Sequence, residues 1–230
     1  MEKNNNTSLP LLRPKVAIIT GVNYGGLGFG ITQRLLELLP KDQSLTIIFA
    51  CRNYTRASKV RDYFIKKQYE WIDYLFLNAG HLSALGLNWR LIFSLFFKHP
   101  IRLMESSDAT IQCRGEINQD GLGKVFASCV FGHYVMMRQL ESLLSNSIDG
   151  SRVIWTSSST ALNELFDIND WQGIKSELPY ESSKWACDLL AVASNDYFQQ
   201  HQLNITSFTT SPAVVASRIG NLPLWIIYLR

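Results

Sequence analysis

The stretch Lys15-Val-Ala-Ile-Ile-Thr20, followed by Gly21-Val-Asn-Tyr-Gly25-Gly26-Leu-Gly28, decides the fold of this chain. Its first half is a short apolar and β-branched run, which is typical of a buried parallel strand. Its second half is a glycine-rich turn, and residues 31–39 continue with the spacing of an amphipathic helix. Plain tight turns also use glycine, but a glycine turn between a strand and a helix predicts a site for a pyrophosphate.

Strands and helices alternate along the rest of the chain. We predict further strands at residues 44–51, 74–77, 151–157 and 203–208, and helices at residues 55–69, 120–144 and 180–200. The segment 81–116 is predicted to be an irregular cap or loop. This alternation predicts an α/β fold with a doubly wound, mostly parallel, Rossmann-like sheet. Residues 1–14 are expected to form a disordered tail before a single domain at residues 15–230.

Composition excludes several classes of protein. The chain has 230 residues, of which 47% are hydrophobic and 18% are charged, and this excludes wholesale disorder. A net charge of +3 without a basic cluster does not indicate a nucleic-acid partner. Four cysteines without metal-ligand spacing predict free thiols and no metal site. We also expect no secretory signal and no membrane span, because no apolar run is long enough.

Two apolar stretches remain open to two interpretations. One covers residues 91–97, which are followed by Lys98 and His99, and the other covers residues 222–229. Both could pack in the core. Alternatively, they could form an interfacial surface for a membrane or an apolar substrate, with basic residues at the lipid headgroups. The same two interpretations, core packing or contact with an apolar substrate, apply to the aromatic residues Trp89, Phe93, Phe96 and Phe97.

A tyrosine and a lysine at helical spacing point to acid–base chemistry. Tyr180 and Lys184 stand at positions i and i+4, so they share one face of the predicted helix. A nearby cation should lower the pKa of a phenol from its ordinary value of about 10. The strand that ends in Trp155-Thr-Ser-Ser-Ser159 adds hydroxyl groups at the carboxyl edge of the sheet. Arg52, just past the second strand, suits the 2′-phosphate of NADP better than the free hydroxyl of NAD, unless it is a solvated surface residue.

With these features the sequence resembles the short-chain dehydrogenase/reductases. Within that family it is similar to the 3-keto-steroid reductase/17β-hydroxysteroid dehydrogenase type 7 group. The resemblance is carried by the motifs Ala50-Cys-Arg-Asn53, Leu77-Asn-Ala-Gly80, Val130-Phe-Gly-His133, Ile154-Trp-Thr-Ser-Ser158, Pro179-Tyr-Glu-Ser-Ser-Lys184 and Asp188-Leu-Leu190.

The resemblance implies an NADPH-dependent reduction of a sterol or steroid 3-ketone. Tyr180 would donate a proton to the carbonyl oxygen, Lys184 would hold the nicotinamide ribose and lower the pKa of the tyrosine, and Ser158, or else Ser157, would hydrogen-bond the carbonyl. The implied cofactor-binding residues are Gly21, Gly26, Leu27, Gly28, Arg52, Asn78, Gly80, Tyr180, Lys184, Val214 and Ser217.

The resemblance also implies a location and partners. The expected location is the cytosolic face of the endoplasmic reticulum membrane, or the cytoplasm if the anchor of relatives lies in a region that this chain lacks. An apolar ketone would be the substrate, and a membrane surface or a sterol-synthesis complex would be a partner. The resemblance is also compatible with a homo-oligomer.

The chain departs from the family pattern at several places. The glycine turn has one residue more than TGxxxGxG, so either Gly25 or Gly26 takes the middle position. Asn78 follows Arg52 by only 26 positions, and we therefore expect the sheet to lack one edge strand that relatives have there. Relatives also continue beyond the end of this chain, so we expect its domain to be truncated at the C-terminus.

Single residues depart from the pattern as well. Pro212-Ala213 replaces the usual Pro-Gly, and Cys129 stands where the family has a structural Asn. His133 on the same helix is interpreted as a packed residue rather than a catalyst. These departures keep two alternatives open, namely a reductase of another apolar carbonyl and a catalytically impaired relative that acts as a binding or scaffold subunit.

Overall fold

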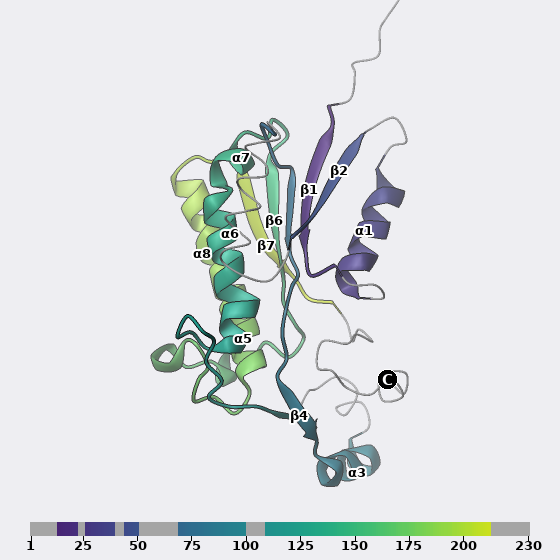
Figure 1. Cartoon of the computed structure of the whole chain (residues 1–230), viewed down its shortest axis with the longest axis vertical. Coiled ribbons are helices and arrows are strands. Elements are labelled where there is room, and N and C mark those ends of the chain that lie inside the picture. The colour runs from purple at the N-terminus through teal and green to yellow at the C-terminus, as the bar shows by residue number, and fades with distance from the viewer. Residues whose placement is uncertain (1–12, 23–25, 40–43, 51–68, 100–108, 213–230) are drawn as a thin grey trace, which may run out of the picture.

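The computed structural model describes residues 13–22, 26–39, 44–50, 69–99 and 109–212 (Figure 1). The predicted helix at residues 55–69 and most of the predicted N-terminal tail lie outside these residues. No helix among the described residues is both long enough and apolar enough to cross a membrane.

A five-stranded parallel sheet forms the centre of the domain. In spatial order its strands are β2 (Leu45–Ala50), β1 (Lys15–Thr20), β3 (Tyr74–Leu77), β6 (Ser151–Thr156) and β7 (Ile205–Thr210). Each predicted strand is confirmed to within about two residues, as is usual for element ends. The α/β fold with a parallel sheet is therefore as predicted.

Helices cover both faces of this sheet (Figure 1). Helix α1 (Leu27–Leu38) lies on one face, and α8 (Pro179–Gln200) packs on the other beside the segment that follows β5. Because both faces are covered, β1 and β6 are buried almost throughout, which explains their continuous apolar runs. Trp155 at the centre of this core is fully buried, and its Nε1 donates to Ser207 Oγ at 3.1 Å.

The predicted irregular segment 81–116 is wrong in part. It contains an antiparallel pair of strands, β4 (Ala84–Leu87) and β5 (Thr110–Gln112), with α3 (Trp89–Lys98) between them. The Asn88 side chain caps α3 by accepting the N–H of Leu91 at 3.1 Å. Two strands of three or four residues show too little periodicity to be recognised in a sequence.

The single long helix predicted at residues 120–144 is confirmed in its position but is wrong in part. The structure divides it into α5 (Lys124–Phe126), a π-helical turn η1 (Ala127–Phe131), α6 (Gly132–Gln139) and α7 (Glu141–Ser145). The helical segment begins at Lys124 rather than at residue 120, because Gly121 has a positive φ of 78° and Gly123 packs against Gln172. Two 3₁₀ turns, η2 (Asn163–Leu165) and η3 (Ile168–Asp170), lie between β6 and α8.

Strand β2 lies at one edge of the described sheet. It pairs with β1 and with no other strand among the described residues. The expected lack of an edge strand concerns residues 53–77, most of which lie outside the described residues, so it stays a prediction. The chain runs from β1 outward to β2 and then returns to β3 on the other side of β1. Ligands of open α/β sheets bind outside the carboxyl ends of the strands at such a reversal, which places the candidate site beyond β1 and β3.

Candidate functional site

Thr20, the last residue of β1, joins the two chain segments that leave the sheet at its reversal. Its Oγ1 accepts the backbone N–H groups of Asn78 and Ala79, each at 2.7 Å. The Asn78 side-chain amide donates in return to the Thr20 carbonyl oxygen at 3.0 Å. The predicted cofactor residue Asn78 is thus held against the end of β1, with Gly80 two residues further along.

The glycine turn fits closely against this junction. Gly21 has a φ of +69°, and a Cβ atom there would lie 2.7 Å from the Ala79 Cα. A Cβ atom on Gly28 would lie 2.8 Å from the Gly21 carbonyl oxygen. Any other residue would therefore clash at either position, and at Gly21 its backbone would be strained as well.

The same turn leaves the start of α1 without side-chain caps. Gly26 is the N-cap residue and provides no side-chain hydrogen bond, and the first turn, which begins at Leu27, contains no acidic residue. Helix N-terminal N–H groups in this state can bind an anion such as a phosphate. Of the two glycines proposed for the middle position of the motif, Gly25 lies outside the described residues.

The structure brings Tyr180 and Lys184 together at the start of α8. Lys184 Nζ lies 5.5 Å from the centroid of the Tyr180 ring. This lysine is buried, and its Nζ donates to the Thr156 carbonyl oxygen at 2.7 Å. The pair is therefore fixed at the carboxyl end of β6, next to β3 in the sheet and on the same edge as the glycine turn.

The electrostatics of the pair differ from the sequence-based prediction. Burial raises the pKa of Tyr180; the charge of Lys184 lowers it, as predicted, but by less, so the overall shift is upward. For Lys184, burial lowers the pKa, but the neighbouring Tyr180, Cys129 and Cys187 raise it by more. Lys184 is therefore a permanent cation beside a protonated phenol.

The two candidate serines after β6 have different surroundings. Ser158 Oγ lies 3.0 Å from Thr160 Oγ1 and also accepts the N–H of Thr160 at 3.2 Å. Ser157 is buried, and among the described residues neither its Oγ nor the buried Asp188 Oδ1 has a partner at normal hydrogen-bond geometry. Burial raises the pKa of Asp188, which Ser157 and Lys184 partly offset. Both serines stay candidates for the contact to a carbonyl.

Gln112 is a site residue that the sequence analysis missed. Its Oε1 accepts the N–H of Tyr180 at 3.1 Å, and its Nε2 donates to the buried carboxylate of Glu181 at 2.6 Å. Leu178, the N-cap residue of α8, offers no side-chain cap, so this amide from β5 takes that place. No sequence signal identifies it, because Gln112 and Tyr180 are joined only by the fold.

Cys129, which replaces the family Asn, contacts the segment that follows β3. Its Sγ lies 3.4 Å from the backbone nitrogen of His81 and 3.7 Å from the His81 carbonyl oxygen. The thiol thus touches both backbone groups of the residue after Gly80. It lies in the π-helical turn η1 and is fully buried.

His133 connects this helix to Thr20. Its Nδ1 lies 3.0 Å from the Cys129 carbonyl oxygen, which only accepts, so Nδ1 carries the hydrogen. Burial, followed by the charge of Lys184, lowers the pKa of His133 to about 3, so the ring is neutral. Nε2 therefore accepts from the Thr20 hydroxyl at 3.1 Å. His133 is a packed, hydrogen-bonded helix residue, as predicted.

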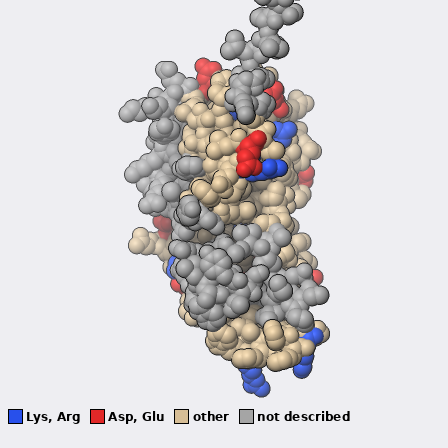
Figure 2. Space-filling model, turned by 90° about the vertical axis from the view of Figure 1, so that its right-hand side faces the viewer, with Lys and Arg blue, Asp and Glu red and all other residues tan. Residues whose placement is uncertain are grey.

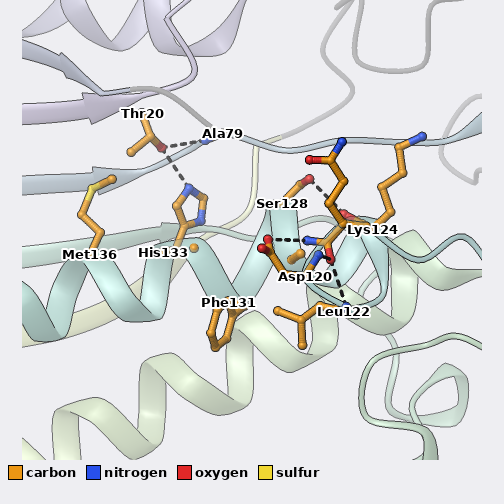
Figure 3. Close-up of a pocket in the computed structure, with 13 residues that line it drawn as sticks. Thr20, Ala79, Asp120, Leu122, Lys124, Ser128, Phe131, His133 and Met136 are labelled. Carbon is orange, nitrogen blue, oxygen red and sulfur yellow. Dashed lines mark hydrogen bonds between the residues drawn. The ribbon is translucent and has the colours of Figure 1, made fainter. Parts of the chain in front are cut away.

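A cavity of about 280 Å³ lies beside this network (Figure 3). It reaches the ends of β1 and β3 and runs along one face of α5, η1 and α6, but it does not touch Tyr180, Lys184 or Ser158. Its lining is formed by Thr20, Ala79, Asn118, Gln119, Asp120, Leu122, Lys124, Ala127, Ser128, Phe131, Gly132, His133 and Met136. The cavity is therefore adjacent to the glycine turn and separate from the predicted reaction centre.

Three predicted cofactor-binding residues cannot be placed at this edge. Arg52, Val214 and Ser217 lie outside the described residues, so their roles stay predictions. The other predicted residues, from Gly21 to Lys184, all follow the carboxyl ends of β1, β3 or β6 or begin the helices beyond them.

Curated relatives cover most of the chain. It is 34% identical to the 3-keto-steroid reductase/17-beta-hydroxysteroid dehydrogenase 7 of Rattus norvegicus, over 94% of this chain and 72% of the rat protein. The protein of the same name from Homo sapiens is 33% identical, over 92% and 70%. The rat alignment spans 248 positions but covers 94% of the 230 residues here, so about 32 positions of the rat protein have no counterpart within it. No protein-family model matches the chain.

Solved structures share the fold. The NADPH-bound carbonyl reductase from chicken fatty liver has a TM-score of 0.54 at 16% identity, covering 87% of this chain and 79% of that one. A short chain dehydrogenase/reductase from Burkholderia phymatum in complex with NAD has a TM-score of 0.52 at 15% identity, covering 90% and 70%. The solved structures show the fold, and the curated relatives show that the chain belongs to the short-chain dehydrogenase/reductase family.

Proposed function

We propose that the chain is an NADPH-dependent reductase of a sterol or steroid 3-ketone. The family is one of oxidoreductases, and the curated relatives that cover most of the chain carry the name 3-keto-steroid reductase. The observation that carries the proposal is the buried Lys184, fixed by Thr156 beside the Tyr180 ring at the edge that also holds the glycine turn.

The glycine turn supports a dinucleotide as the cofactor. At Gly21 and Gly28 a Cβ atom would clash with neighbouring backbone, so the close packing of this turn requires glycine at both positions. The uncapped N–H groups at the start of α1 would hold the pyrophosphate, and Asn78 and Gly80 would line the adenosine side. When bound, NADPH would supply the hydride.

The chain's own residues would supply the proton and hold the substrate. Tyr180, which keeps its proton because burial raises its pKa, would donate it to the carbonyl oxygen. Lys184 would stabilise the phenolate that remains, because its charge is permanent and close. Ser158 or Ser157 would hydrogen-bond the carbonyl oxygen and orient the ketone.

The test compares Tyr180→Phe with Tyr134→Phe, which removes a hydroxyl from the surface of α6. Cofactor affinity is read from NADPH fluorescence, and turnover is measured with a sterol 3-ketone. Tyr180→Phe should lower turnover by about 10²-fold or more and leave NADPH affinity nearly unchanged, because general acid catalysis contributes on that scale. Tyr134→Phe should match the parent. Retained turnover in Tyr180→Phe would overturn the assignment of the proton donor.

The same assays distinguish the alternatives. A parent chain that does not bind NADPH would favour a binding or scaffold subunit. Binding with turnover only of other apolar carbonyls would favour a different reductase. The preference for NADPH rests on Arg52, so Arg52→Glu should weaken NADPH far more than NADH. Equal losses for the two cofactors would contradict a contact of Arg52 with the 2′-phosphate.

A further inference from the structure

Helix α3 lies at one end of the molecule (Figure 1), and four of its aromatic side chains are exposed. The exposed fractions are 50% for Trp89, 62% for Phe93, 60% for Phe96 and 79% for Phe97. At 3.6 residues per turn, these four positions fall within about 100° of the helix circumference. They therefore form one continuous aromatic stripe, which we call the α3 stripe.

The exposure of the α3 stripe is not explained by packing of the helix against the domain. The side of α3 that faces the protein is formed by other residues, namely the buried Leu95 and the half-buried Leu91 and Ile92. Helix α3 is thus apolar on two sides, and within the part of the chain that the structure describes only one side is covered. Of the two interpretations of residues 91–97, packing into the described core fails for the α3 stripe. A helix that is apolar nearly all round needs a second apolar environment.

Charge indicates which environment this is. Arg90 and Lys98 are exposed on α3 between the α3 stripe and the side that faces the protein, and residues 81–99 contain no Asp or Glu. At the end of the molecule where Figure 1 places α3, the face in Figure 2 shows Lys or Arg and no Asp or Glu. Aromatic residues flanked by basic ones match the acyl–headgroup boundary of an anionic bilayer.

A second copy of the chain fits this surface less well. A two-fold contact through the α3 stripe would pair the same patch with itself and bring two sets of Arg90 and Lys98 together. Like charges at close range oppose such a contact, whereas anionic lipids attract both residues. We propose that the α3 stripe, with Arg90 and Lys98, lies on an anionic lipid surface. This proposal goes beyond the proposed reaction and does not depend on it.

The experiment is co-sedimentation of the full chain with vesicles of phosphatidylcholine, with or without phosphatidylserine. The test variant is Phe93→Ser/Phe96→Ser/Phe97→Ser. The control is Ile148→Ser/Val192→Ser, which removes exposed apolar side chains elsewhere. The aromatic variant should lower partitioning onto the phosphatidylserine vesicles by about tenfold or more, because it removes three large apolar groups. The control should partition like the parent.

A second variant tests the charges independently. Arg90→Glu/Lys98→Glu should lose the preference for phosphatidylserine, by about tenfold or more, since each basic residue near such a surface contributes on that scale. Absence of parent binding, or equal binding by the aromatic variant, would overturn the proposal. Self-association that disappears in the aromatic variant, without vesicle binding, would overturn it in favour of a second copy. Because all five side chains are exposed, unfolding in urea should be unchanged in both variants.

Discussion

Lowering the pH from 7 to 5 should destabilise the domain through His133. The ring is buried between Thr20 and the Cys129 carbonyl oxygen, and burial followed by the charge of Lys184 lowers its pKa to about 3. In the unfolded chain the pKa of a histidine is about 6.5. Between these two values the unfolded chain binds a proton that the folded chain does not. The free energy of unfolding therefore falls as the pH falls through this window.

The size of the effect follows from the two pKa values. A difference of one proton changes the free energy of unfolding by about 1.4 kcal/mol per pH unit. From the unfolded value near 6.5 down to pH 5, His133 alone should therefore remove about 2 kcal/mol. That is a large share of the 5–15 kcal/mol that typically stabilises a small domain.

The assay is urea unfolding at a series of pH values for the parent, His133→Gln and the control His201→Gln. His133→Gln starts from a lower stability but should lose about 2 kcal/mol less between pH 7 and 5, because glutamine does not titrate. His201→Gln changes an exposed histidine and keeps His133, so it should follow the parent. The other titrating groups are common to the parent and His133→Gln, so their contributions cancel in the difference. Equal pH slopes for parent and His133→Gln would refute the reasoning.

Two further predictions concern hydrogen bonds at the candidate site. Thr20→Val removes the acceptor of two backbone N–H groups after β3 and should lower the free energy of unfolding by about 2–4 kcal/mol. The control Thr32→Val removes a hydroxyl that only donates to the carbonyl oxygen of Gly28, one turn earlier, and should lower the free energy of unfolding by less than about 0.5 kcal/mol. Equal urea midpoints for Thr20→Val and Thr32→Val would count against a central role of Thr20. Gln112→Leu removes the amide that holds the start of α8 and should lower kcat for a ketone while NADPH affinity stays close to that of the parent. An unchanged kcat would show that Gln112 does not position Tyr180.

The parts of the fold that depend on local pattern could be predicted from the sequence. The buried strands contain short apolar runs because both faces of the sheet are covered, and in β1 and β6 this signal is strong. The site residues that lie at fixed spacing on one element, such as Tyr180 and Lys184, could be predicted as a pair for the same reason.

The parts that depend on contacts between distant segments could not be predicted. The π-helical turn holds Cys129, which contacts His81 and Cys187, and contacts between such distant segments leave no periodic pattern in the sequence. The direction of the Tyr180 pKa shift depends on how deeply the ring is buried, and sequence spacing reports only the nearby charge of Lys184.

The segment that the sequence described least well joins the proposed surface to the proposed reaction centre. Strands β4 and β5 carry α3 between them, and β5 ends in Gln112, whose amide holds Tyr180 and Glu181. The α3 stripe and the hydrogen bonds of Gln112 therefore belong to one strand–helix–strand unit. Because the Gln112 amide contacts α8 and is not part of the α3 stripe, Gln112→Leu should weaken turnover without weakening vesicle binding.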